Sequence, residues 1–103
     1  MKELNSKEFE KETSQGIAVI DFFATWCGPC KMMAPILEAV EADLEGKAKF
    51  FKVDVDENES LARKFGVLSI PTIIVLENGE VREKHIGLRQ HEDAFDTINS
   101  YCK

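Results

Sequence analysis

The sequence predicts an α/β domain built on a mixed β-sheet. Strand-like and helix-like segments alternate along the 103 residues, an order that is typical of α/β folds. The strand–helix–strand unit at 17–55 is long enough to connect two parallel strands. Asn78-Gly79 separates two further strand-like runs and indicates an antiparallel hairpin. Because the chain contains no linker or internal repeat, we expect one domain over residues 1–103.

The first segment of the chain carries the pattern of a helix start followed by a buried strand. Asn5 can act as an N-cap and Glu8 can complete a capping box, so we expect a helix that ends near Gly16. Residues 17–24 form a nearly continuous apolar run that contains one acid, Asp21. Such a run is typical of a strand that is buried on both faces.

The middle of the chain predicts a helix and a second strand. A helix over residues 27–44 would carry one apolar stripe, made of Met33, Ile36, Leu37, Val40 and Leu44. Gly46 is suited to the end of this helix, because glycine readily adopts the left-handed conformation found there. Residues 48–55 alternate and contain aromatic and β-branched side chains, which predicts a strand.

The last part of the chain predicts a short helix, a hairpin and a closing helix. Asn58 can cap the short helix and Gly66 can end it. The hairpin arms are residues 72–77 and 80–86, and the charge on the second arm suits an exposed edge strand. On the closing helix we expect one side to carry Phe95, Ile98 and Cys102.

Charge and cysteine content narrow the classes of function. The formal net charge of −6 argues against nucleic acid or an anionic membrane as the main partner, because both select basic surfaces. No apolar segment is long enough to cross a bilayer, and the N-terminal residues do not resemble a signal peptide, so we expect a cytoplasmic protein. Three cysteines in that setting fit a redox or metal-binding role better than a disulfide framework.

The run Cys27-Gly28-Pro29-Cys30 lies where the apolar strand ends and the long helix begins. On a first helical turn, sulfurs at i and i+3 can form a disulfide, and the free N–H groups of the helix end favour a thiolate on the first one. We expect an exposed Cys27 to attack a substrate disulfide and a more shielded Cys30 to displace it. The alternative, two ordinary helix residues, is disfavoured by this spacing.

Asp21 and Lys52 are unusual because both lie within strand-like segments. Burial makes a charged carboxylate costly and raises its pKa, and Asp21 shares a strand face with Val19 and Phe23. Such a residue could accept a proton from the resolving thiol, but an acid with an ordinary polar partner explains it equally well. Lys52 alternates with Phe50 and could pair with Asp21, although a solvated lysine is the more common case.

Two further positions near the dithiol each allow two interpretations. Pro71, in Ile70-Pro71-Thr72, stands at the start of a strand, where proline is tolerated, and the sequence alone does not decide between a cis and a trans bond. Trp26 precedes Cys27 and is either an apolar platform for substrates or part of the core.

These features together resemble the thioredoxin family over essentially the whole chain. The resemblance rests on motifs in the family's order: Asp21, Trp26-Cys27-Gly28-Pro29-Cys30-Lys31, Ala34-Pro35, Lys52-Val53-Asp54, Ile70-Pro71-Thr72, Asn78-Gly79 and Gly87. A bare CxxC pair would be weak evidence for this family, whereas the whole set of motifs at these spacings is strong evidence. The resemblance implies the thioredoxin fold, a central mixed β-sheet flanked by helices on both faces, with the dithiol at the tip of the second helix.

For the dithiol, the resemblance implies a redox disulfide between Cys27, the nucleophile, and Cys30, the resolving cysteine. It implies that Asp21 and Lys52 lie beneath the cysteines and assist proton transfer to and from Cys30. Gly28-Pro29 between the cysteines is similar to the reducing members of the family, which indicates a reducing rather than an oxidising role.

For the substrate groove, the resemblance implies that Ile70-Pro71 is cis and faces the dithiol, with the backbone of Ile70 pairing with the substrate chain. Trp26 and Gly87 would border the groove. The chain departs from the family at Phe23, where many members have a second tryptophan, and at a first strand that is cut to Met1–Leu4.

The resemblance also implies the activity and partners. It predicts a monomeric, general protein disulfide reductase without a bound cofactor, acting on disulfide-containing proteins. A thioredoxin reductase, either an NADPH-dependent flavoprotein or a ferredoxin-linked enzyme, would re-reduce it. The alternative is a thioredoxin-fold binding subunit or clamp in which the cysteines are not essential. The complete dithiol, together with Asp21, weighs against that alternative.

A metal centre is the third interpretation of the cysteines. Cys27 and Cys30 supply only half of a tetrahedral ligand set, while Cys102, His85 and His91 are isolated in the sequence. We therefore expect no metal. Cys102 lies outside the family's motif, and we expect a half-buried residue there, with an intermolecular disulfide as the alternative.

Overall fold

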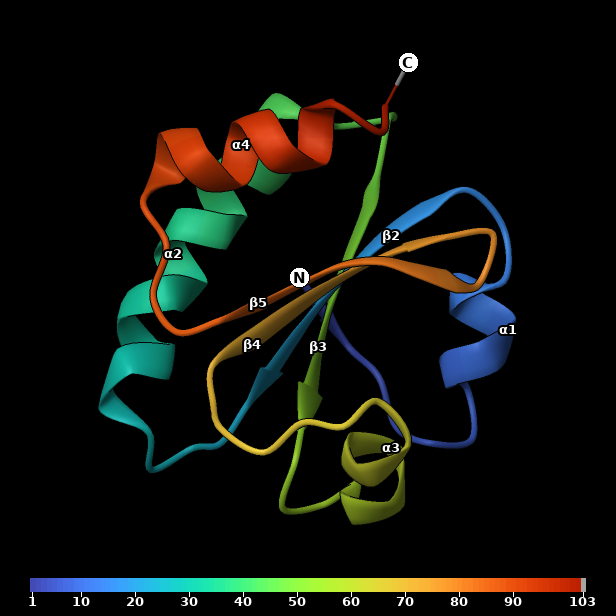
Figure 1. Cartoon of the computed structure of the whole chain (residues 1–103), viewed down its shortest axis with the longest axis vertical. Helices are drawn as coiled ribbons and strands as arrows, with labels where there is room; N and C mark the ends of the chain where they lie inside the picture. The colour runs from blue at the N-terminus through green and yellow to red at the C-terminus, as the bar shows by residue number, and fades with distance from the viewer. Residues whose placement is uncertain (103) are drawn as a thin grey trace.

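The computed structural model describes residues 1–102, and Figure 1 shows a twisted sheet between two pairs of helices. The strands are β1 (Lys2–Glu3), β2 (Ile17–Phe23), β3 (Lys49–Asp54), β4 (Thr72–Glu77) and β5 (Glu80–Ile86). The helices are α1 (Phe9–Thr13), α2 (Gly28–Asp43), α3 (Glu59–Lys64) and α4 (His91–Asn99). Within residues 1–102, none of these helices has the length and apolar character that a membrane crossing requires.

The sheet is mixed, as the sequence predicts. Its strands lie in the order β1-β3-β2-β4-β5. Both β1 and β2 run parallel to β3, whereas β4 is antiparallel to β2 and β5 is antiparallel to β4. The central strand, β2, is buried except at its last residue, Phe23, which agrees with its apolar run. The charged arm β5 forms one edge of the sheet, and the truncated strand β1 forms the other.

Two apolar cores lie on the two faces of the sheet. Helices α2 and α4 cover one face, where their buried residues pack with Val19, Phe50 and Val75 of the strands. Helices α1 and α3 cover the other face, against Ile20 and Phe22. In Figure 1 the two helix pairs accordingly lie on opposite sides of the strands. The expectation of helices on both faces is therefore confirmed.

Strand alternation places the buried acid beneath α2. Residues Ile17 and Val19 of β2 belong to the core under α2 and α4, so Asp21 points toward the same face. Lys52 of β3 shares this face with Phe50, and it is the register partner of Asp21 across the parallel pair. The sheet therefore brings the acid and the lysine side by side below the start of α2.

The hairpin has the arms and the turn that the sequence predicts. Asn78 and Gly79 both have positive φ, 51° and 85° respectively, as a two-residue hairpin of the primed type requires. The Asn78 side chain also accepts a hydrogen bond from the N–H of Gly16 at 2.9 Å. The turn is thereby attached to the loop that precedes β2.

Three local predictions need correction. The capping box forms, with Glu8 N–H donating to Asn5 Oδ1 and Asn5 N–H donating to Glu8 Oε1, but it closes a turn ahead of α1, which begins only at Phe9. Asn58 occupies the N-cap position of α3, as predicted, but its side chain makes no capping hydrogen bond, because it bonds the backbone of Ser6 and Asp54 instead.

The third correction concerns Cys102, which lies beyond the end of α4 at Asn99 rather than on the helix. Its Sγ contacts the carbonyl oxygen of Ile98 at 3.4 Å, and the side chain is half-buried, as expected. Ser100 and Tyr101 form a turn after α4, which explains why the helical spacing does not continue to Cys102.

Candidate active site

A disulfide joins Cys27 and Cys30 at the N-terminus of α2, with their Cα atoms 5.3 Å apart. Cys27 is the N-cap of the helix in an extended conformation, and the N–H of Cys30 is directed at Cys27 Sγ at 3.2 Å. Pro29 occupies the first turn, where its missing N–H would have had no helical partner. The helix therefore begins at the reactive pair, as the spacing predicts.

The two cysteines do not differ in exposure as the sequence predicts. Cys27 is 5% exposed and Cys30 is 4% exposed, so the expectation of an exposed first sulfur is wrong for the disulfide form. Both belong to one apolar cluster with Ala24, against which half-buried residues such as Ile70 pack. In a disulfide each sulfur also covers part of the other.

The loop before β4 lies against the disulfide. The Ile70-Pro71 bond is cis, which agrees with the resemblance, and the Ile70 carbonyl oxygen lies 4.0 Å from Cys27 Sγ. The N–H of Gly87 donates to the Pro71 carbonyl at 2.8 Å, so the end of β5 is attached to this loop. Gly87 has φ +93°, a conformation that other residues rarely adopt.

Trp26 lies on the surface beside the disulfide and not in the core. It is 69% exposed, and its Nε1–H donates to Asp56 Oδ2 at 2.7 Å. A hollow of about 180 Å³ separates Trp26 from Ile70, with Leu68 on its rim. Leu68 is 96% exposed. Neither Asp56 nor Leu68 is among the residues predicted from the sequence. The signal for Leu68 is an apolar side chain that lies outside every predicted element.

Asp21 lines a pocket of about 260 Å³ together with Cys30 and Lys52. The carboxylate is 2% exposed, and its Oδ1 has no hydrogen-bond partner among the described residues. Burial raises the pKa of Asp21 from 3.8 to about 7, and the charge of Lys52 opposes this shift. The interpretation of Asp21 as an acid with an ordinary polar partner is therefore disfavoured, and the acid shares its pocket with Cys30.

Lys52 is half-buried and not fully solvated. Its Nζ lies 5.5 Å from the centroid of the Phe23 ring, which is a cation–π distance. Among the described residues Lys52 has no direct ion pair with Asp21, so its influence on the acid acts across the pocket. Phe23, the departure from the common tryptophan, thus lies against the lysine and lines the same pocket.

We expect Lys52→Met to raise the pKa of Asp21 further above 7, because the variant removes the positive charge that favours the carboxylate. An NMR titration of the Asp21 carboxyl carbon in the oxidised protein measures this directly. Lys64→Met on α3 is the control, since Lys64 belongs to the helix on the opposite face of the sheet, and the titration there should match the wild type. If the pKa of Asp21 were unchanged or lowered in Lys52→Met, Lys52 would not be the charge that favours the Asp21 carboxylate.

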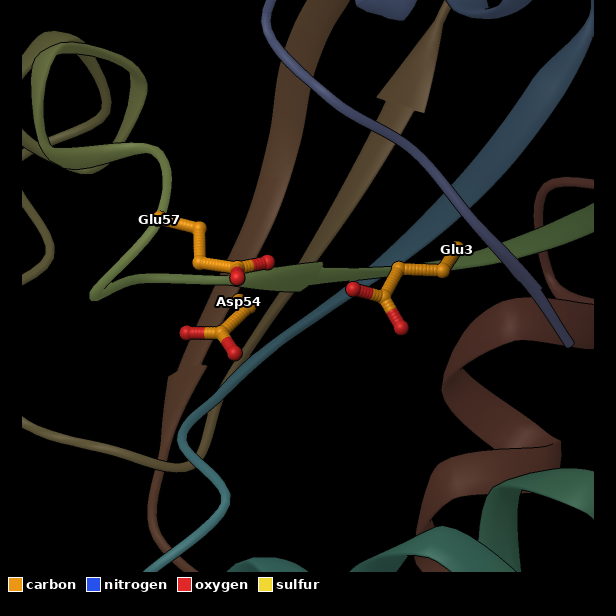
Figure 2. Close-up of side chains that lie close together, drawn as sticks. All are labelled: Glu3, Asp54 and Glu57. Carbon is orange, nitrogen blue, oxygen red and sulfur yellow. The ribbon is translucent and has the colours of Figure 1, made fainter.

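The other residues considered for a metal site have different partners. His85 bonds Glu83, and His91 bonds Asp43. Within the described chain, three possible ligand oxygens come within 4.8 Å of one another at the acidic cluster of Glu3, Asp54 and Glu57 (Figure 2). These carboxylates come from β1, the end of β3 and the turn before α3. The cluster therefore includes none of the cysteines and histidines that the sequence offered as metal ligands.

The fold and the position of the disulfide together define the class of protein. A mixed sheet that supports a disulfide at the N-terminus of a helix, where a thiolate is stabilised, is the arrangement of a thiol–disulfide oxidoreductase. The comparisons with known proteins agree. The family model described as Thioredoxin matches residues 1–100. The chain therefore belongs to the thioredoxin family and is a dithiol–disulfide oxidoreductase.

Similar proteins extend over nearly the whole chain. A thioredoxin of Listeria monocytogenes is 46% identical over 101 residues, covering 98% of each chain. A thioredoxin of Bacillus subtilis is 46% identical over 95 residues, covering 92% of this chain and 91% of the relative. Among solved structures, a mutant thioredoxin from Halobacterium salinarum superimposes with a TM-score of 0.89 at 33% identity, covering 99% of this chain and 90% of that one.

Proposed function

We propose that this chain is a general protein disulfide reductase in which Cys27 is the nucleophile and Cys30 is the resolving cysteine. The observation that carries this proposal is the N–H of Cys30, which lies 3.2 Å from Cys27 Sγ at the first turn of α2. Once the pair is reduced, this N–H and the helix dipole stabilise a thiolate on Cys27. Gly28 and Pro29 between the cysteines are both exposed, so this end of α2 lies at the surface.

The exchange has two steps. The Cys27 thiolate attacks one sulfur of a substrate disulfide, which forms a mixed disulfide and releases the other substrate sulfur as a thiolate. Cys30 then loses its proton and attacks Cys27 Sγ, which breaks the mixed disulfide and releases the second substrate sulfur. Two electrons pass to the substrate, two protons complete its thiols, and the protein keeps the Cys27–Cys30 disulfide.

Asp21 is the proton acceptor for Cys30 in this proposal, and Lys52 supports it. The support comes from the shared pocket, the unpartnered Oδ1 and a pKa of about 7, which lets the acid gain and lose a proton near neutral pH. Burial raises this pKa, and Lys52 limits the rise by favouring the charged form. The pocket of about 260 Å³ has room for water, through which the proton can pass between the carboxylate and the sulfur.

Substrate proteins dock, in this proposal, beside Trp26, Ile70, Pro71 and Gly87. The exposed indole and the hollow next to it offer apolar contact area. The backbone of Ile70 lies next to Cys27 and can pair with an extended substrate chain. Gly87 extends this surface through its bond to Pro71.

The proposed partners follow from the direction of the reaction. A chain that reduces its substrates must regain electrons, so we propose a thioredoxin reductase as the donor, in the cytoplasm, with the protein acting as a monomeric single domain. The exchange uses only the two cysteines and nearby side chains, and it calls for no further cofactor.

An assay of insulin reduction tests the proposal. With dithiothreitol as the electron source, the purified protein should accelerate the release of insulin thiols, and the same acceleration should appear when NADPH and a flavoprotein thioredoxin reductase replace dithiothreitol. A ferredoxin-linked reductase is tested in parallel to identify the donor. Failure to accelerate the dithiothreitol reaction would refute the proposed reductase function.

A further inference from the structure

The loop between β5 and α4 is attached to the helix that carries the disulfide. The backbone N–H of Arg89, in this loop, donates to the Sδ of Met33 at 3.4 Å. Met33 lies on α2, three residues after Cys30, and its side chain is completely buried. A thioether is a weak acceptor, and here it satisfies a backbone donor on a neighbouring loop.

Two anchors fix the position of this loop beside the dithiol. Gly87 N–H bonds the carbonyl of Pro71, which follows the residue that contacts Cys27, and Arg89 N–H bonds Met33. Leu88 lies between the two anchors and is 40% exposed. The anchors therefore hold an apolar side chain at the surface, between the proline loop and α2.

Water has little room to replace the sulfur. The cavity that Met33 and Arg89 line with residues of β4, β5 and α4 measures only about 10 Å³, which is at the lower limit for one water molecule. If the acceptor were lost, the half-buried Arg89 N–H would have to move toward solvent to find a partner, because an unpaired donor shielded from water is costly. The loop, and Leu88 with it, would shift relative to the disulfide.

We propose that Met33 is a positioning residue for the docking of protein substrates, acting through its sulfur on the loop of residues 87–90. The inference rests on the proposed reductase function and adds to it a residue that touches neither the substrate nor the reacting sulfurs. A protein substrate covers the loop as well as the cysteines, whereas a small disulfide needs only the cysteines. The loss of the sulfur should therefore weaken protein docking and leave the chemistry unchanged.

The test compares Met33→Leu with Met32→Leu. Leucine conserves the volume of methionine and removes the acceptor, and Met32, the neighbouring residue, is 60% exposed and serves as the matched control. For Met33→Leu we expect KM for insulin to rise about five-fold with kcat unchanged. The rate with the small disulfide 5,5′-dithiobis(2-nitrobenzoate) should equal that of the wild type. The Arg89 amide should exchange with solvent about five-fold faster, and Met32→Leu should change none of these values.

The results separate the Arg89–Met33 hydrogen bond from the proposed role of Met33 in docking. Unchanged exchange at Arg89 would show that the tether does not form, and faster exchange with an unchanged KM would remove the docking role. An equal loss of rate with both disulfides would indicate general damage to α2 and overturn the positioning role. The hydrogen bond from Arg89 N–H to Met33 Sδ also predicts that the Arg89 amide of the wild type is protected from exchange with solvent. An unprotected amide would show that this bond does not form. If the wild type reduces neither disulfide, the proposed function fails, while the exchange data still decide the tether.

Discussion

Cys27→Ser is expected to lower the rate of protein-disulfide reduction by at least about 1000-fold, because a serine hydroxyl cannot form the thiolate that begins the exchange. Cys30→Ser is expected to allow the first attack and then stop, since nothing can displace Cys27 from the mixed disulfide. The insulin-reduction assay measures the rate, and mass spectrometry of each variant after mixing with insulin measures the trapped mixed disulfide. The Cys30 variant should gain the mass of a substrate chain, and the Cys27 variant should not.

Cys102→Ser is the matched control for these two variants, because Cys102 is the free cysteine of the chain and lies beyond the end of α4. It should retain the wild-type rate. A trapped substrate on the Cys27 variant would reverse the assigned roles. If the Cys27→Ser variant supported the activity of a partner complex as well as the wild type does, the chain would act as a clamp with non-essential cysteines. This is the alternative that the sequence left open.

Asp21→Asn is expected to stabilise the oxidised protein at alkaline pH. The folded protein holds a proton on Asp21 up to about pH 7, whereas the unfolded chain loses it near pH 3.8. The folded state therefore binds more protons between these values, and wild-type stability falls as the pH rises through this window. The gain of Asp21→Asn over the wild type should grow by roughly 4 kcal/mol from pH 4 to pH 8.

Chemical denaturation of the oxidised protein at pH 4 and at pH 8 measures this gain, with Glu10→Gln on the exposed side of α1 as the control. The control should show a pH-independent difference from the wild type. The same Asp21 variant should resolve mixed disulfides more slowly, since the proton acceptor is gone. A gain that is equal at both pH values would contradict a raised pKa, and an unchanged rate of resolution would remove Asp21 from proton transfer.

Much of the fold could be predicted because local signals and tertiary structure agree. The apolar run of β2 requires burial on both faces, and Asn78-Gly79 requires a tight hairpin, so both elements could be placed from the sequence. Asn58 shows where such reasoning fails. Its amide can satisfy either the helix end or the more distant Ser6, and only the packed chain decides between them.

For the candidate site, the sequence indicates the residue types but not the environment. The CxxC spacing predicts the disulfide at the helix start, and strand alternation places Asp21 and Lys52 on one face. Their separation across a pocket depends on Phe23 and on the packing of α2, which no local pattern reveals. The equal burial of the two sulfurs and the bond between Arg89 and Met33 depend likewise on segments far apart in the sequence.

The reduction potential of the Cys27–Cys30 couple tests the reductase assignment most directly. Trp26, the one tryptophan of the chain, lies next to the disulfide and can report its redox state by fluorescence during equilibration with dithiothreitol or glutathione buffers. A reducing role predicts a potential below about −240 mV, in the range of cytosolic reductants. A potential above about −200 mV would identify an oxidant or isomerase and contradict the assignment.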